Sequence, residues 1–461
     1  MSANTGILTY NAGVQNLRMN YYAPSATIAT TGQYVGTFYC FLAKVDAWPV
    51  DEVPPTPEQS QAYINNVFSN MFVAKKINTN DMSPVVERIN WSNGVVYDYY
   101  TDQEDMFAKN QDGTLVKKFY VKNSYDQVFK CLWNNNGGAS TVEPSFQPGT
   151  FNANQIFQGA DDYKWKYLYT VTSGNKLKFM DESWMPVPVS NTSPNPIYSV
   201  RGIGSIDVIN VTDGGTGYDA VNAAITVTIT GDGQYASANA TVTNGSVTDI
   251  VVANTGINYS YANVIISSTQ GSGATAIAPV SPTGGHGTNP MDELGANRIM
   301  LTASFNKNES GNLPTDIDFR QIGLLVNPYV KTGADSYALA NAAVYRTTTN
   351  YVVSIGLKNY IQDETVFQSP DGTLENATFT GTVLSFDSTS GSNTVKLINI
   401  VGTPLTNAIL YGKTSGTTRV ILQEQLPDFV KNSGYMIYIE NRSPVQRNAD
   451  GSEQFKLVLG Y

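Results

Sequence analysis

The stretch Tyr435-Met-Ile-Tyr-Ile439 is a near-continuous apolar run that lies between Gly434 and Pro444. Short runs rich in Ile and Tyr and bounded by Gly and Pro are typical of strands buried on both faces. Glu440 and Arg442 then place one charge of each sign at the end of the run. We therefore predict a deep strand close to the C-terminus, and a deep strand needs neighbours in its sheet.

The residues that follow predict a second, half-buried strand. Asn448-Ala-Asp-Gly451 contains an Asp-Gly pair, which tolerates the positive φ of a tight turn. Apolar Phe455, Leu457 and Leu459 then alternate with more polar residues. We expect a terminal hairpin, and the other candidate strands for its sheet lie hundreds of residues upstream.

The bulk composition favours short strands and many turns. The chain has 461 residues, which exceeds the roughly 250–300 residues at which a single core stops growing, so several domains are expected. Charged residues make up 14%, against about 25% in an average soluble protein. The formal net charge is −10 and no basic stripe occurs, so neither nucleic acid nor a membrane is expected as a partner.

Two cysteines, Cys40 and Cys131, both lie within apolar strand-like runs. Two cysteines cannot form a disulfide framework for a chain of this length, so we expect both to be free, buried thiols in a reducing compartment. No secretory signal and no apolar run of about 18 residues occur, so neither secretion by the usual route nor a membrane span is expected.

One helix is predicted after the Pro-rich stretch at 53–57. Thr56 is the expected cap, Pro57 the first helical residue, and Gln59 completes a capping box. An apolar stripe at helical spacing follows, and we expect it to pack on a sheet rather than bind a cofactor. The stripe comprises Tyr63, Ile64, Val67, Phe68, Met71 and Phe72.

An internal repeat occupies a Gly-, Thr- and Ala-rich region at 201–288. Residues 208–218 reappear at 249–259, so that Tyr218 and Tyr259 are 41 residues apart. A unit of about forty residues buries little surface alone, so the two copies should pack on each other. We expect this region to be an insertion whose two ends sit together.

Several segments together resemble one protein family. Residues 433–444 are similar to the C-terminal segment of the T4-type bacteriophage baseplate wedge subunit that is mainly β and forms a dimer. Residues 319–328 resemble its strand ending in Asn-Pro, and residues 41–91 resemble its N-terminal block. Residues 159–169 resemble a further strand of that family. No single one of these matches is specific to the family, but the order in which the segments follow one another along the chain is.

The expected fold is mainly β: a discontinuous, β-sandwich-like framework with one or two helices, interrupted by two small all-β insertion domains. The strands and turns of the second insertion predict a small barrel. The predicted parts are framework at 1–200, the repeat insertion at 201–288, framework at 289–362, the second insertion at 363–426, and the terminal framework hairpin at 427–461.

Four motifs resemble known kinds of site, but no catalytic, cofactor-binding or metal-binding residue is predicted from them. The single histidine, His286, lies in a Gly-rich junction and favours a loop-packing role. Residues 214–222 fit one Ca²⁺-binding nonapeptide, but such sites need stacked copies, so a turn is favoured over calcium at Asp219. Residues 411–414 lack the Gly of a phosphate loop. The acidic pairs at 161–162 and 181–182 are expected to be solvated surface.

The resemblance implies a non-enzymatic structural subunit of the baseplate wedge of a contractile tail. It implies a homodimer, other wedge subunits as partners, assembly in the host cytoplasm and a final place in the virion. Glu440 and Arg442 are the candidate interface residues. Two alternatives remain open: a virion protein that binds host-surface glycans through the inserted β domains, and a tail-associated hydrolase.

Overall fold

The computed structural model describes residues 36–147, 156–188, 204–219, 224–388 and 393–460, and it is mainly β as predicted. The chain separates into two compact units, one made of residues 1–82 and 301–461 and the other of residues 83–300. The boundary at 82/83 lies inside the segment 1–200 that the sequence suggested as one part of the framework.

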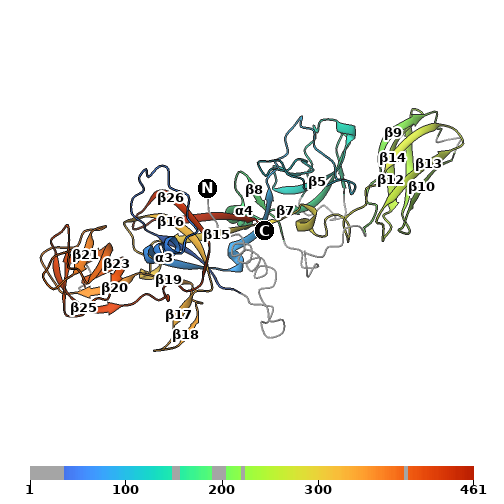
Figure 1. Ribbon diagram of the computed structural model, residues 1–461. Helices are drawn as coiled ribbons and strands as arrows, with labels where there is room; N and C mark the ends of the chain where they lie inside the picture. Colours follow the sequence, from blue (N-terminus) through green and yellow to red (C-terminus); the bar gives the residue numbers. More distant parts are fainter. Residues whose placement is uncertain (1–35, 148–155, 189–203, 220–223, 389–392, 461) are drawn as a thin grey trace. The chain divides into compact units, whose positions relative to one another are not determined.

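A five-stranded antiparallel sheet organises the first unit, and its strands come from four distant parts of the chain (Figure 1). The terminal strand β26 pairs with β16, and β16 pairs with β1, as the prediction of a sheet assembled from distant segments requires. Cys40 lies opposite Leu324, and Gly323 lies opposite Ile439. In sheet order the strands are β19 (Val344–Arg346), β2 (Met71–Ile77), β1 (Phe38–Ala43), β16 (Ile317–Val326) and β26 (Tyr435–Arg447).

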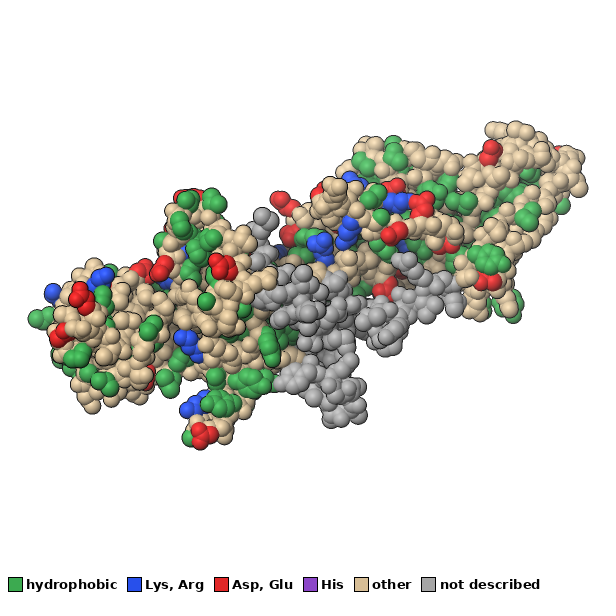
Figure 2. All heavy atoms as spheres, viewed as in Figure 1, with side chains coloured by type: hydrophobic (Ala, Val, Ile, Leu, Met, Phe, Trp, Pro, Cys, Tyr) green, Lys and Arg blue, Asp and Glu red, His purple; other side chains and the backbone are tan. Residues whose placement is uncertain are grey.

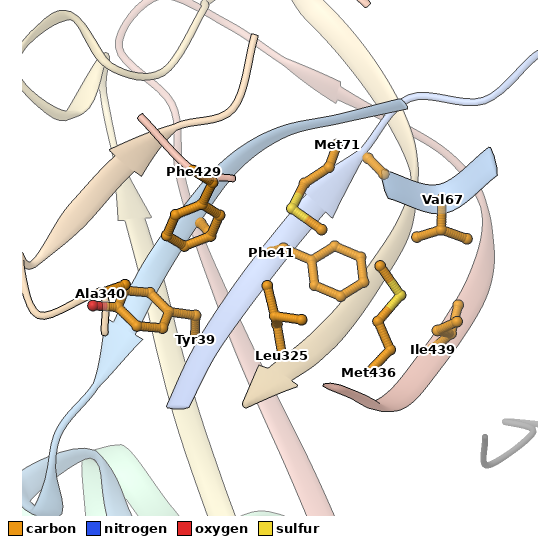
Figure 3. Packing of buried hydrophobic residues seen from close by; sticks show 11 residues of the cluster. Tyr39, Phe41, Val67, Met71, Leu325, Ala340, Phe429, Met436 and Ile439 are labelled. Carbon is orange, nitrogen blue, oxygen red and sulfur yellow. The ribbon is translucent and has the colours of Figure 1, made fainter. Parts of the chain in front are cut away.

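The core of this unit lies where helix α3 (Gln61–Asn70) covers the sheet (Figure 3). Phe41, Leu325 and Ile439 come from three neighbouring strands and are fully buried. Gly323 leaves room for the ring of Phe41, because a Cβ at this position would overlap it. Burial of side chains from β1, β16 and β26 in one cluster explains why the sequence signal of the terminal strand is so apolar.

The helix begins later than the sequence suggested. Ser60, not Thr56, is the N-cap, and its hydroxyl accepts a hydrogen bond of 3.2 Å from the Tyr63 amide. Met71 and Phe72 were predicted on the helical stripe, but they begin strand β2. Both residues stay buried in the strand, which is why an apolar pattern alone did not separate the two states.

The predicted terminal hairpin is wrong in one respect. The deep strand β26 and the half-buried strand β27 (Ser452–Gly460) both form, and Phe455, Leu457 and Leu459 are buried as expected. However, β27 pairs with β15 (Arg298–Asn306) in another sheet rather than with β26. A turn signal fixes a reversal of the chain but does not fix which strand receives the hydrogen bonds.

A closed six-stranded barrel follows the sheet, as the sequence suggested for the second insertion. It takes in Thr349–Val353, which the sequence placed in the framework, because this strand pairs with both β23 and β25. A short two-stranded ribbon, β17 (Tyr329–Lys331) and β18 (Tyr337–Leu339), precedes it. The barrel strands are β20 (Thr349–Val353), β21 (Thr365–Gln368), β22 (Phe379–Asp387), β23 (Asn393–Gly402), β24 (Ile409–Gly412) and β25 (Thr418–Gln425).

The second unit contains a four-stranded sheet around Trp165, which is fully buried. The Trp165 ring stacks on Tyr163 at 5.5 Å and meets Tyr97 edge-on at 5.6 Å. Cys131 on this sheet is free and buried, as is Cys40 in the first unit, which confirms both thiol predictions. The elements are β3 (Met82–Glu87), β4 (Tyr120–Lys122), β5 (Gln127–Asn134), β6 (Ile156–Gln158), β7 (Tyr163–Thr170), α4 (Ser173–Phe179), β8 (Trp184–Pro186) and α5 (Pro290–Glu293). The described residues thus hold three α-helices, one more than expected, because α4 was missed.

The repeat region forms three two-stranded ladders related by an approximate twofold axis. The middle strands of the two copies pair with each other, whereas each first strand pairs with the third strand of the other copy. Val211 opposite Ala276 is thus equivalent to Val252 opposite Ala238. The strands are β9 (Asn210–Thr216), β10 (Ile225–Gly231) and β11 (Ser237–Thr243) in the first copy, and β12 (Ser246–Asn254), β13 (Ala262–Ser268) and β14 (Ser272–Ile277) in the second.

The two repeat tyrosines are equivalent in this arrangement. The Tyr218 amide donates to the Gly245 carbonyl and the Tyr259 amide donates to the Gly204 carbonyl, each at 3.0 Å. Both rings are buried in one core shared by the two copies. The prediction that the copies pack on each other is confirmed, and the exchanged strands explain why neither copy has a core of its own.

The ends of the repeat module lie together, as predicted. The Ser281 amide donates to the Ser205 carbonyl at 2.9 Å, and the Ser205 amide donates to the Ser281 hydroxyl at 2.9 Å. The module also contacts the four-stranded sheet, because Lys164 on β7 pairs with Asp249 at 2.9 Å. The repeat module is therefore anchored at its base by both backbone and side-chain bonds.

Candidate functional site

Glu440 and Arg442, the candidate interface residues, lie on strand β26 and pair with each other. The Arg442 Nε atom is 3.0 Å from Glu440 Oε1, without the alignment of a hydrogen bond. The guanidinium also lies 5.5 Å from the centre of the Phe455 ring, and the other Glu440 oxygen accepts from the Tyr438 hydroxyl. Both residues are half-buried and their charges are paired with each other. Little of that charge is therefore left to bind a partner.

Strand β26 is an edge of its sheet, and in the described part of the chain no strand pairs with its outer side. Two side-chain contacts cover part of this strand. The Trp48 indole donates to the Arg442 carbonyl at 2.9 Å, and the Asn441 amide donates to the Pro55 carbonyl at 2.8 Å.

Large apolar side chains are exposed on the same unit. Tyr435 at the start of β26 is 66% exposed and Tyr337 on the β17–β18 ribbon is 57% exposed. Ile355 and Leu357, in the loop after β20, are also exposed. On the face that Figure 2 shows, Lys and Arg are interspersed with Asp and Glu, and apolar and uncharged side chains cover much of the rest. Exposed aromatic residues with few charges are typical of lasting protein interfaces.

A fully buried charged cluster lies in the second unit. The ammonium of Lys130 on β5 is 3.3 Å from Glu293 Oε2 and 3.2 Å from His286 Nδ1. His286 Nδ1 is 3.3 Å from the same Glu293 oxygen, and the other Glu293 oxygen accepts from the Gly287 amide at 2.6 Å. The ammonium also sits 3.6 Å from the centre of the Tyr100 ring.

The cluster has a structural role, because its charged side chains are buried and stabilise one another. Burial would raise the pKa of Glu293, but Lys130, His286 and the Gly287 amide together lower it to about 2. Burial, followed by the charge of Lys130, lowers the pKa of His286. The side chains of Lys130 and Glu293 are 0% and 1% exposed, so a substrate does not reach them. These charges hold the junction after the repeat module to the sheet.

Sequence reasoning predicted the packing role of His286, and the structure agrees, since its ring meets Tyr100 edge-on at 4.9 Å. It missed the partners of the histidine. One signal was present: Lys130 stands alone in the apolar run of strand β5, and a buried ammonium needs a carboxylate nearby. The sequence could not show which carboxylate, because Glu293 lies 163 residues away.

Two other motifs singled out in the sequence, the acidic pair at 161–162 and the loop at 411–414, have structural roles. One Asp161 oxygen accepts from the Thr141 and Val142 amides, at 2.7 and 3.0 Å, and fixes a turn. In the loop that resembles a phosphate site, the Thr414 and Ser415 amides donate to the Glu364 carboxylate at 3.0 and 2.9 Å. This loop therefore already holds an anion, which is a side chain of the same chain.

The single calcium-type nonapeptide at 214–222 begins inside strand β9, which pairs with β14. Its last three residues lie outside the described residues. Across the described ranges, no three His, Cys, Asp or Glu side chains gather as a metal site. The longest helix among the described residues, α3, has 10 residues, and none there is suited to cross a membrane.

No protein-family model and no curated protein matches this chain.

Proposed function

We propose that the chain is a non-enzymatic structural subunit of the baseplate wedge of a contractile phage tail, acting as a homodimer. The observation that carries the proposal is the pairing of β1, β16 and β26. These three neighbouring strands come from the three segments that resemble the dimer-forming wedge subunit. Segments that resemble one family in the same order, and that pair in one sheet although they are far apart in sequence, support a shared framework.

One surface feature supports a role in permanent interfaces. The exposed apolar residues Tyr337, Tyr435 and Leu357 lie on the same unit. Interfaces that persist are enriched in aromatic side chains and depleted of charge. In a wedge, such surfaces would bind the second copy and the neighbouring wedge subunits.

Antibody labelling of virions tests the proposed location. Gold-labelled antibody raised against the purified chain is expected to bind particles of the encoding phage at the tail end distal to the head. The label should appear on negatively stained particles and on isolated baseplates. Label confined to the head, the sheath or the fibre tips would contradict the proposal. Particles incubated with pre-immune serum serve as the control.

A further inference from the structure

A cavity of about 380 Å³ opens in the first unit between helix α3, the loop after β1 and strand β23 of the barrel. Sites for small molecules usually measure about 300–1,000 Å³, so this one has room for about one or two sugar rings. Its wall includes Trp48 and Asp46 from the loop, Tyr63 and Asn66 from the helix, and Gln321 from β16. The proposed role in the wedge does not use this cavity.

The chemistry of the wall favours an uncharged, hydroxyl-rich ligand. Trp48 and Tyr63 supply aromatic rings, and the exposed Asn66 supplies an amide. The Asn70 amide already donates to the Asn66 carbonyl at 2.9 Å and to its side-chain oxygen. Asp46 is the one charged side chain among the described residues that line the cavity, and it is an acceptor. Phosphate and carboxylate ligands are disfavoured, because no described cation faces them there.

A buried hydrogen-bond network fixes the floor of the cavity before any ligand arrives. The Gln321 Nε2 atom donates to the Tyr63 hydroxyl at 2.9 Å and to Asn441 Oδ1 at 2.8 Å. The Tyr63 hydroxyl in turn donates to Asn441 Oδ1 at 2.9 Å. Tyr63 and Gln321 are therefore held in one orientation, which lowers the ordering cost of binding.

We infer that the cavity binds a neutral saccharide unit. A sugar ring offers an apolar C–H face for Trp48 or Tyr63, and hydroxyls for the Asp46 carboxylate and the Asn66 amide. The site is lined mainly by framework residues and borders strand β23 of the barrel, which belongs to the second inserted β domain that the sequence offered as a glycan-binding module.

The test uses the full chain on an array of neutral glycans, followed by saturation-transfer NMR with D-glucose, D-galactose and N-acetyl-D-glucosamine. Saturation transfer to at least one of the sugars is expected. Replacing two exposed wall residues, Asp46→Ala with Asn66→Ala, should weaken binding at least tenfold. The matched control, Glu52→Ala with Gln61→Ala, changes two exposed residues outside the cavity and should leave binding unchanged.

Two results would overturn the inference. The first is absence of binding both on the array and by saturation transfer. The second is binding that the Asp46→Ala, Asn66→Ala variant keeps at full strength, which would place the sugar elsewhere on the chain. Either result leaves the labelling of the baseplate and the mass of the dimer unaffected, so failure of this inference is distinguishable from failure of the proposed function.

Discussion

The substitution Glu293→Gln is expected to lower the free energy of unfolding of the 83–300 unit by about 3–5 kcal/mol. It leaves the fully buried ammonium of Lys130 without its counter-ion, while the size of the side chain at 293 barely changes. Denaturant unfolding followed by tryptophan fluorescence measures the effect. Four of the five tryptophans, Trp91, Trp133, Trp165 and Trp184, lie in this unit.

A double variant separates the effect of the uncompensated charge from the effect of side-chain shape. The double variant Glu293→Gln, Lys130→Met removes both charges and should recover part of the loss, because no uncompensated ion remains in the core. The control is Lys176→Met, which breaks an ion pair with Asp126 in the same unit. Lys176 is 51% exposed, so its loss should cost less than about 1 kcal/mol. Equal losses in Lys176→Met and Glu293→Gln would refute the role of the buried pair.

The same cluster predicts the direction of the acid dependence. The pKa of Glu293 is lowered from 4.5 to about 2 in the folded chain, and the pKa of His286 is lowered from 6.5. In both cases the unfolded state takes up the proton first as the pH falls. The stability contributed by these groups is therefore complete above pH 6.5 and is lost progressively as the pH falls towards 2. Glu293→Gln should flatten the part of this loss that lies below pH 4.5.

The substitution Ile439→Ala is expected to destabilise the first unit by about 2–5 kcal/mol. Ile439 is 0% exposed and packs in the cluster that joins β1, β16 and β26, so truncation leaves a cavity at the centre of the discontinuous sheet. Amide hydrogen exchange of peptides covering 38–43 and 317–326 reports the opening of these strands. Faster exchange is expected in both peptides, although neither contains the altered residue.

Tyr435→Ala is the matched control, on the same strand. Tyr435 is 66% exposed, so its truncation in the isolated chain should change the free energy of unfolding by no more than about 0.5 kcal/mol. If Ile439→Ala speeds exchange only in its own strand, then β26 does not complete the core shared with β1 and β16. That result would refute the discontinuous sheet.

Local patterns in the sequence predicted the elements of this sheet but not all of their partners. The apolar run at 435–439 predicted a deep strand, and the alternation at 455–459 predicted a half-buried one, because each pattern reports burial directly. Which strands pair depends on contacts made by distant residues. The terminal hairpin was therefore predicted where β27 in fact joins β15.

Apolar residues at an element boundary were the second source of error. Met71 and Phe72 continue the spacing of the helix and are also buried in strand β2, so hydrophobicity alone fits both states. The N-cap at Ser60 was missed for a related reason, because Thr56 and Pro57 present an equally good start signal. The polar floor of the cavity was not predicted either, since Tyr63, Gln321 and Asn441 come together only in the folded sheet.

The account rests on a chain built to make lasting interfaces, first with its own copy. Size-exclusion chromatography with multi-angle light scattering on the purified chain tests this most directly. The mass should be twice the 50.0 kDa of one chain and should not fall on dilution. A mass of 50.0 kDa at every concentration would contradict the homodimer that the resemblance to the wedge subunit implies.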